Sequence, residues 1–367
     1  MKKRKNEREV CGLWSLPDDV FHLECLTRLS RLDLVAFAMA SKRHRNVAAA
    51  HIISDLRSRR RGCVELYMYV FIHMYPDPSP RWFLLHPVQR RLKRINLDYS
   101  YPVAGSCFVW DEWGVFVIGG LINGKPTSEV TLFDFTDHTV SPLKPMKMAR
   151  SGASIDEKKI YVFGGCWDVA DSSNWVEVYD LQTDTWEFLS VFTPKMPLKI
   201  QQSVVTDNNK HVHAVDEDGQ IFNFSATECA FESDGRRESN PENRSNWLFA
   251  VGDTIFCRGT GGKILWRFPS QLDWKEVHGL EELQQQHSGF DIIKMLIHSN
   301  ERMAILWESR TQGPEHVLEL WYAEISMVRG CIDGVLEVVG TIEWSGPIFS
   351  DSSVTGLNLL FAETFYL

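Results

Sequence analysis

The stretch "KKIYVFGGCW" (158–167) decides the fold of this chain. In it, a run of β-branched and aromatic residues at 160–163 ends at two adjacent glycines. Such a run is typical of a β-strand, and paired glycines are typical of a point where the backbone turns sharply or packs closely. A stretch of the same construction, "WGVFVIGGLI" (113–122), stands about 45 residues earlier, at a spacing typical of repeat architectures. The chain therefore contains one local pattern twice, which predicts a repeat.

The two repeats stay alike beyond their glycines. The phrases "FDFTDHTV" (133–140) and "YDLQTDTW" (179–186) each place an aromatic residue and Asp on a strand, followed by a short polar turn and a large apolar residue. Each unit is therefore predicted to be strand, Gly-Gly, loop, strand, tight turn, strand. Weaker copies follow at 211–233, 254–277 and 303–344, and the chain ends in a strand at 357–367.

The start of the repeat region favours a closed ring. The segments 63–74, 81–87 and 91–97 have the character of the outer strands of a blade that lacks its inner ones. We expect the C-terminal strands to complete this blade, because an open stack of sheets leaves aggregation-prone edges. The strand before each turn is counted six times, at 115–118, 160–163, 211–215, 254–257, 303–307 and 357–362. Residues 63–367 are thus predicted to form one all-β propeller of six blades.

Charge divides the chain into two parts. Residues 1–62 hold 14 Lys and Arg against 7 Asp and Glu, whereas residues 63–367 hold 25 against 41. Such a difference between segments indicates different partners. The acidic larger part argues against a nucleic-acid partner, because binding to phosphate backbones needs clustered cations.

Targeting signals are sparse. The basic start "MKKRKNEREVCGLW" is not followed by the apolar run of a signal peptide, and no apolar run reaches the roughly 18 residues of a membrane helix. We therefore expect a soluble protein of the nucleus and/or cytoplasm with no membrane partner. "KKRK" (2–5) is either a nuclear address or a solvated terminus.

The basic segment in front has a helical period. In "WSLPDDVFHLECLTRLSRLDLVAFAMASKRHRNVAAA" (14–50), leucine and valine recur at three to four residues, and a second helix near 31–40 is apolar nearly all round. A segment of about 40 residues rarely buries enough surface to fold alone, so another protein is expected to cover it. Its basic character predicts an acidic partner surface. We predict a disordered basic tail at 1–13 and a small all-α domain at 14–60.

Both parts resemble known modules. "VFVIGG", "IYVFGG" and "YDLQTDTW" resemble the kelch repeat, most clearly over 113–190. "LPDD" (16–19), "LTRL" (26–29), "LDL" (32–34) and "SKRHRNV" (41–47) resemble the F-box, whose closing stretch usually has Trp where this chain has His44. An F-box followed by a kelch propeller is similar to a large plant family of F-box/kelch-repeat substrate receptors.

The resemblance implies a function without catalysis by this chain. The F-box would dock on the Skp-type adaptor of an SCF (cullin–RING) ubiquitin ligase, and the propeller would hold the target protein, with no catalytic residues, cofactor or metal of its own. The implied adaptor-binding residues are Leu16, Pro17, Val20, Leu23, Leu26, Leu29, Leu34 and Val35.

Loops on a rigid scaffold are the default place for target binding. The loops after the Gly pairs contain Asn123, Lys125, Trp167 and Asp168, and Arg150 stands where kelch proteins often present a basic residue. Trp167 is the strongest of these candidates, because Trp is enriched at binding hot spots. The alternative for each is an ordinary exposed loop residue.

Sequence motifs for phosphate or metal binding are weak in this chain. "GTGGK" (259–263) lacks the first Gly and the Ser or Thr of a phosphate-binding loop, which favours a blade turn. "HVH" (211–213) offers two imidazoles without a third ligand nearby, which favours ordinary strand histidines over a metal site. Two alternative functions stay open: a non-ligase kelch scaffold or ligand sensor, and a propeller oxidoreductase with a tightly bound metal.

Overall fold

The computed structural model of the chain consists of two compact units, Met1–Leu66 with Tyr366–Leu367 and Tyr67–Phe365. The structure describes residues 17, 20–26, 29, 37, 39–48, 66–86, 89–96, 105–111, 114–135, 138–149, 153–156, 159–164, 174–195, 198–206, 211–225, 227–233, 235–237, 249–251, 254–286, 291–299, 302–311, 317–332 and 334–366. None of the helices within these ranges is long and apolar enough to cross a membrane.

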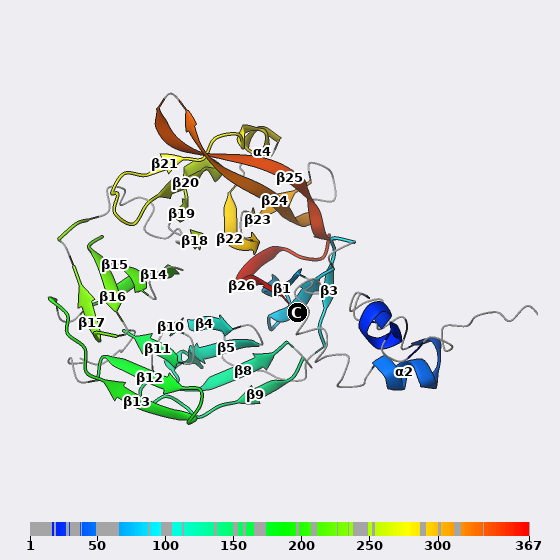
Figure 1. Ribbon diagram of the computed structural model, residues 1–367, viewed down its shortest axis with the longest axis horizontal. Coiled ribbons are helices and arrows are strands. Elements are labelled where there is room, and N and C mark those ends of the chain that lie inside the picture. The colour runs from blue at the N-terminus through cyan, green and yellow to red at the C-terminus, as the bar shows by residue number, and fades with distance from the viewer. Residues whose placement is uncertain are drawn as a thin grey trace, which may run out of the picture. The chain divides into compact units, whose positions relative to one another are not determined.

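The larger unit is a β-propeller of six four-stranded sheets (Figure 1), which confirms the predicted architecture. From inner to outer strand, blade 1 consists of β26 (Gly356–Tyr366), β1 (Leu66–Tyr75), β2 (Arg81–Leu85) and β3 (Leu92–Arg94). Blade 2 consists of β4 (Ser106–Asp111), β5 (Gly114–Gly119), β8 (Val130–Asp134) and β9 (Val140–Pro142). Blade 3 consists of β10 (Ala153–Asp156), β11 (Lys159–Phe163), β12 (Val176–Asp180) and β13 (Thr185–Leu189).

Blades 4 to 6 repeat this order. Blade 4 consists of β14 (Ile200–Thr206), β15 (His211–Asp216), β16 (Ile221–Ser225) and β17 (Ala230–Glu232). Blade 5 consists of β18 (Phe249–Val251), β19 (Thr254–Arg258), β20 (Ile264–Arg267) and β21 (Lys275–Glu276). Blade 6 consists of β22 (Ile292–Ser299), β23 (Arg302–Arg310), β24 (Leu318–Ile332) and β25 (Val335–Asp351). The helix α4 (Glu281–Gln286) lies in the connection between blades 5 and 6.

Ring closure joins the two ends of the propeller segment in one sheet. The C-terminal strand β26 is the innermost strand of blade 1 and pairs with β1, so the expected completion of this blade from the C-terminus is confirmed. One detail of the prediction was wrong. Residues 357–362 were counted with strands that take the second place in their blades, whereas β26 takes the first place and β1 the second. Both strands are apolar runs, and the sequence alone does not show which place in the sheet each one takes.

The repeat continues into blades whose glycine pairs are gone. In blades 1 to 4 a non-glycine residue with positive φ stands one or two positions before the outermost strand: Arg90, His138, Asp184 and Cys229, with φ between 48° and 57°. At that position, between the third and fourth strands, the backbone has the left-handed helical conformation. The shared backbone conformation therefore marks blade 4 as a true repeat unit.

Aromatic rings fill the interface between blades 1 and 2. The ring of Tyr69 lies 4.2 Å from that of Phe135, which in turn lies 4.1 Å from Phe365 of the closing strand. Phe361, also on β26, has its ring 5.7 Å from Trp82 and 5.5 Å from Phe108. Edge-to-face and offset rings add to the hydrophobic term, so this cluster ties the closing strand to both blades.

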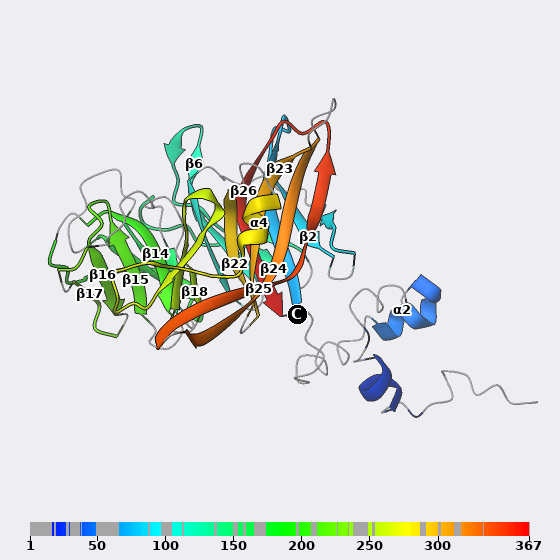
Figure 2. The same cartoon turned by 90° about the horizontal axis from the view of Figure 1, so that it is seen from above.

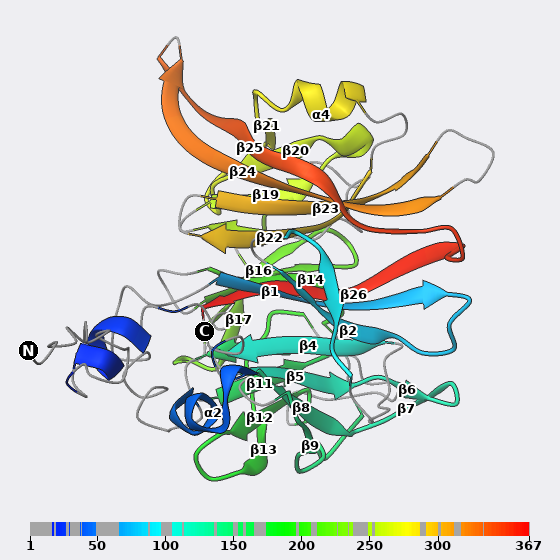
Figure 3. The same ribbon diagram turned by 90° about the vertical axis from the view of Figure 1, so that its right-hand side faces the viewer.

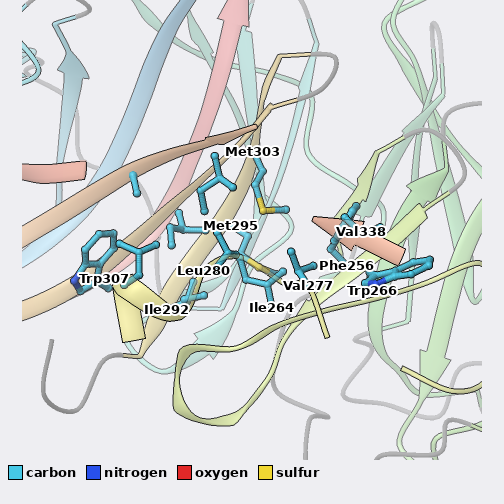
Figure 4. Close-up of a cluster of buried hydrophobic side chains, with 14 residues drawn as sticks. Phe256, Ile264, Trp266, Val277, Leu280, Ile292, Met295, Met303, Trp307 and Val338 are labelled. Atoms are coloured by element: carbon cyan, nitrogen blue, oxygen red, sulfur yellow. The ribbon is translucent and has the colours of Figure 1, made fainter. Parts of the chain in front are cut away.

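Apolar side chains fill the other blade interfaces as well. Figure 4 shows the cluster between blades 5 and 6, in which Trp266 and Trp307 are fully buried. Leu280 from the connecting segment and Leu283 from α4 also belong to this cluster. Since each sheet buries one face against each neighbour, no blade could hide its apolar surface alone.

An ion pair with a buried glutamate joins the innermost strands of blades 6 and 1 at the same closure. Lys294 Nζ on β22 lies 3.6 Å from Glu363 Oε1 on β26. Burial raises the pKa of Glu363 from 4.5 to about 7, although the Lys294 ammonium works against this rise. A carboxyl whose pKa is higher in the folded than in the unfolded state makes its full contribution to stability at a pH below the unfolded-state pKa. That contribution is lost as the pH rises through the folded-state pKa.

The smaller unit has short described helices. The helical segment η2 (Val20–Cys25) and α2 (Lys42–Ala48) bring Phe21 and Leu26 into one buried cluster. The His44 ring meets Phe37 edge-on at 4.5 Å, so His44 makes an aromatic contact where the F-box usually has Trp. Much of 14–60 lies outside the described residues, and the domain limits 1–13, 14–60 and 63–367 stay predictions.

We predict that Phe361→Ala destabilises the whole propeller by about 3–5 kcal/mol, because it empties a buried site in the closing strand. Urea unfolding followed by tryptophan fluorescence measures the free energy. The exposed Asn358→Ala on the same strand is the matched control and should change it by less than about 0.5 kcal/mol. Equal effects of the two variants would contradict a closing role for the ring.

We also predict that Glu363→Gln gains stability relative to the natural protein as pH rises from 5 to 8. The natural protein loses the contribution of the protonated carboxyl across this window, up to about 3 kcal/mol, whereas glutamine does not titrate. Unfolding midpoints across the pH series measure the difference. The exposed Glu343→Gln is the control, and a stability difference for Glu363→Gln that falls toward pH 8 would refute the assignment.

Candidate functional site

One end of the propeller carries the connection that contains Asn123 and Lys125, two of the predicted target-binding residues. Because strands alternate in direction, the turns between second and third strands and those leading to the next blade share this end, here called the loop end. Figures 2 and 3 show three of them projecting together: the hairpin β6–β7, the β1–β2 turn and the β25–β26 turn. The tip of the long β24–β25 hairpin points to the opposite end.

The first glycine pair builds a hairpin at the loop end. Gly119 and Gly120 have φ of 65° and 103°, which a side chain would strain, and they end β5. The chain then forms β6 (Leu121–Ile122) and β7 (Lys125–Pro126) around Asn123 and Gly124, with φ of 52° and 76°. Positive φ at both central residues is the signature of a type I′ turn, which explains the Asn-Gly pair.

The structure places two of the five predicted target-binding residues. Asn123 and Lys125 lie on the β6–β7 hairpin, and both are exposed, as is Ile122 beside them. Arg150, Trp167 and Asp168 lie outside the described residues. The binding role of all five stays a prediction.

Buried carboxylates hold the loops of this end, and sequence reasoning missed them. Glu177 on β12 is fully buried and accepts hydrogen bonds from the Lys147 and Met148 amides at 2.6 and 2.9 Å. Asp216, at the end of β15 and fully buried, accepts the amides of Asp218 and Gln220. Acidic residues within apolar strand patterns were the available signal, because a buried carboxylate needs donors.

Lys195 ties one of these carboxylates to a second connection. Its ammonium lies 2.9 Å from Asp216 Oδ2 and also contacts Asp218. Hydrogen bonds to Asp218, the larger effect, and to Asp216 raise the pKa of the Lys195 ammonium. The β15–β16 turn is thereby fixed to the segment that enters blade 4.

A pocket of about 260 Å³ opens between blades 1 and 6, beside the closing strand, and is called the seam pocket here. Blade 1 supplies one wall. Phe83 pairs directly with Arg94 across β2 and β3, and Arg81 pairs with Ile72 across β1 and β2, so these side chains share the face that packs on blade 6. The full lining is Met74, Tyr75, Pro76, Asp77, Arg81, Phe83, Arg94, Phe349, Asp351, Ser353 and Val354.

The opposite wall of the seam pocket is fixed by hydrogen bonds. Asp351 Oδ1 accepts the Ser353 amide at 2.7 Å and its hydroxyl at 2.6 Å, and these bonds lower the pKa of Asp351. The Thr355 amide donates to the Tyr75 carbonyl at 2.8 Å, which links the β25–β26 turn to blade 1. The pocket is therefore framed by chain segments from the two ends of the propeller.

The helical unit exposes part of its predicted adaptor surface. Pro17 is exposed and Val20 is 38% exposed, whereas Leu26 is buried in the unit's own cluster and Leu29 is half-buried beside it. Leu23 lies in η2. Leu16, Leu34 and Val35 are outside the described residues. Met39, which was not predicted, is the most exposed large apolar side chain of the described residues, at 76%.

The weaker motifs have structural roles. "GTGGK" forms the turn between β19 and β20, which contains the short 3₁₀ segment η5 (Thr260–Gly262), and Lys263 pairs with Glu276 at 2.7 Å. The His213 ring is buried and contacts Asn223 Oδ1 and the Arg267 guanidinium. The described residues contain no group of three or more His, Cys, Asp or Glu arranged to hold a metal ion.

Comparison with known proteins agrees with this architecture. The family model described as "FKB95, Kelch-repeats domain" matches residues 84–349. A protein of Arabidopsis thaliana provisionally named an F-box/kelch-repeat protein is 30% identical over 95% of this chain and 91% of its own length.

The chain belongs to the F-box/kelch-repeat protein family. Two further F-box/kelch-repeat proteins of Arabidopsis thaliana are each 28% identical to it. One match covers 95% of this chain and 93% of the relative, and the other covers 90% and 88%. The family model spans neither β1 nor β26, so the seam of this F-box/kelch-repeat chain lies at the margin of the matched region.

We predict that Glu177→Ala loosens the loop end by removing the buried carboxylate that accepts from two loop amides, at a cost of about 2 kcal/mol. Hydrogen–deuterium exchange should show faster exchange at the amides of Lys147 and Met148. Glu187→Ala, on the exposed face of the neighbouring strand, is the control and should leave both amides protected. Unchanged exchange in Glu177→Ala would show that the carboxylate does not fix this loop.

Proposed function

We propose that this chain is the substrate-recognition subunit of an SCF (cullin–RING) ubiquitin ligase. In this proposal the helical unit binds the Skp-type adaptor, and the loop end of the propeller binds the target protein. The observation that carries it is the match to F-box/kelch-repeat proteins over 95% of the chain, which includes the helical unit as well as the propeller.

The organisation of the chain supports this division of labour. The basic helical part and the acidic propeller part belong to separate compact units. Val20 and Met39 leave apolar surface exposed on a unit that is too small to hide it. A partner protein that covers these side chains would complete the helical unit.

The proposed mechanism is proximity. A receptor that holds its target beside the ubiquitin-charged enzyme raises the effective concentration of target lysines, so the receptor itself needs no catalytic residue. The rigid loop end suits this role because Glu177 and Asp216 fix the loops before any target arrives. We propose the nucleus and/or cytoplasm as the place of action.

We predict that the full chain co-purifies with a recombinant plant Skp-type adaptor, and that Val20→Asp weakens this complex at least about 10-fold. The aspartate introduced at position 20 would be a buried charge without a partner in the interface with the adaptor. Calorimetric titration of the adaptor into each variant measures the affinity. Pro17→Ala, at an exposed residue just before the same helical segment, is measured in parallel and should also weaken binding.

Val328→Asp is the matched control for this experiment. Val328 is a 60% exposed valine on the β24–β25 hairpin of the propeller, so the same chemical change there should leave adaptor binding intact. Absence of binding by the natural chain would refute the ligase assignment. Equal binding of all variants would refute the adaptor surface.

A further inference from the structure

The seam pocket has the chemistry of a binding site rather than of a packing defect. Its lining combines the apolar side chains of Met74, Phe83, Phe349 and Val354 with charged ones around a volume of about 260 Å³. The Tyr75 side chain at the rim is 44% exposed. A space of this size fits one aromatic side chain of another protein, with an adjacent residue at the exposed Arg94, and excludes a folded element.

The charged groups of the pocket are unequally paired. Arg81 NH1 lies 2.8 Å from Asp77 Oδ2, and Asp351 accepts two hydrogen bonds from Ser353. Arg94 is exposed and forms no hydrogen bond or ion pair within the part of the chain that the structure describes. The Arg94 guanidinium therefore lies without a described partner next to the aromatic side chains of the pocket. An unpaired guanidinium can bind a carboxylate through two parallel hydrogen bonds.

We propose that the seam pocket binds an acidic side chain, together with a neighbouring aromatic residue, from the protein that the propeller holds. The carboxylate pairs with Arg94, and the aromatic ring packs among Tyr75, Phe83 and Phe349. This inference rests on the proposed role of the propeller as a target receptor, and it adds a site that is separate from the β6–β7 hairpin.

The charge balance of the pocket favours a carboxylate over a phosphate. Asp77 and Asp351 lie in the same lining, so a dianion would face two negative groups while only one guanidinium lacks a partner among the described residues. A monoanion is repelled less and is neutralised by Arg94 alone. The acidic composition of the propeller part gives no general attraction for anions, so binding depends on this local guanidinium.

The test uses the full chain and three short synthetic peptides, acetylated and amidated at their ends. Each contains a central tyrosine flanked by glycine and serine, followed by glutamate, glutamine or phosphoserine. Calorimetry at about 0.15 M salt measures the dissociation constants. The glutamate peptide is expected to bind at least about 10-fold tighter than the glutamine peptide, and Arg94→Gln should remove that difference.

Lys93→Gln is the matched control. Lys93 is the exposed neighbour of Arg94 on β3, and successive strand residues point to opposite faces, so its loss should leave the preference for glutamate intact. The proposal fails if the glutamate peptide does not bind up to about 5 mM or binds no better than the glutamine peptide. It also fails if phosphoserine binds more tightly, or if Lys93→Gln acts like Arg94→Gln.

The two proposals fail in different ways. Arg94 lies in the propeller unit, so Arg94→Gln should keep full affinity for the Skp-type adaptor in the calorimetric titration. A natural chain that binds the adaptor but shows no preference for the glutamate peptide refutes only the seam pocket, whereas absent adaptor binding by the natural chain refutes the receptor role itself.

Discussion

Pairing of the last strand with the first strand of the propeller segment is the constraint on which the rest of this structure depends. Each blade buries one face against each of its neighbours, so an unclosed array would expose the apolar faces of two terminal blades. β26 prevents this by taking the innermost place in blade 1, more than 280 residues along the chain from β1. Its aromatic residues Phe361 and Phe365 then lock against rings from blades 1 and 2.

The same ring closure creates the seam pocket, the part of the propeller best suited to bind another molecule. Toward the middle of blade 1, the face that meets blade 6 is apolar and fully packed, with Val70 and Ile72 buried. Toward the loop end that face carries Arg81 and Arg94 instead, and packing gives way to the seam pocket. A change from apolar to cationic residues along one sheet face thus converts an interface core into a binding surface. The rigid frame comes from the segments that close the ring.

Loop geometry in this propeller is set by buried polar groups as much as by glycine. Gly119 and Gly120 supply the backbone conformation that ends β5 and begins the β6–β7 hairpin. Glu177 and Asp216 supply buried carboxylates that accept hydrogen bonds from loop amides. The glycines were visible in the sequence because their pairing is local and repeated. The carboxylates were not, because their partners lie about 30 residues away in the case of Glu177 and in an irregular turn in the case of Asp216.

What the sequence by itself determined is the set of local structures and their number. Strand periods, paired glycines and repeated turn phrases are local properties, and they were sufficient for a propeller of six blades completed from its C-terminus. The order of β26 and β1 within their sheet, the grouping of Arg81 and Arg94 with Phe349, and the burial of Glu363 beside Lys294 were decided only by tertiary structure. The physical reason is that these features join residues about 70 to 255 or more positions apart. Their contacts arise from ring closure, and no local sequence pattern predicts which distant residues ring closure brings together.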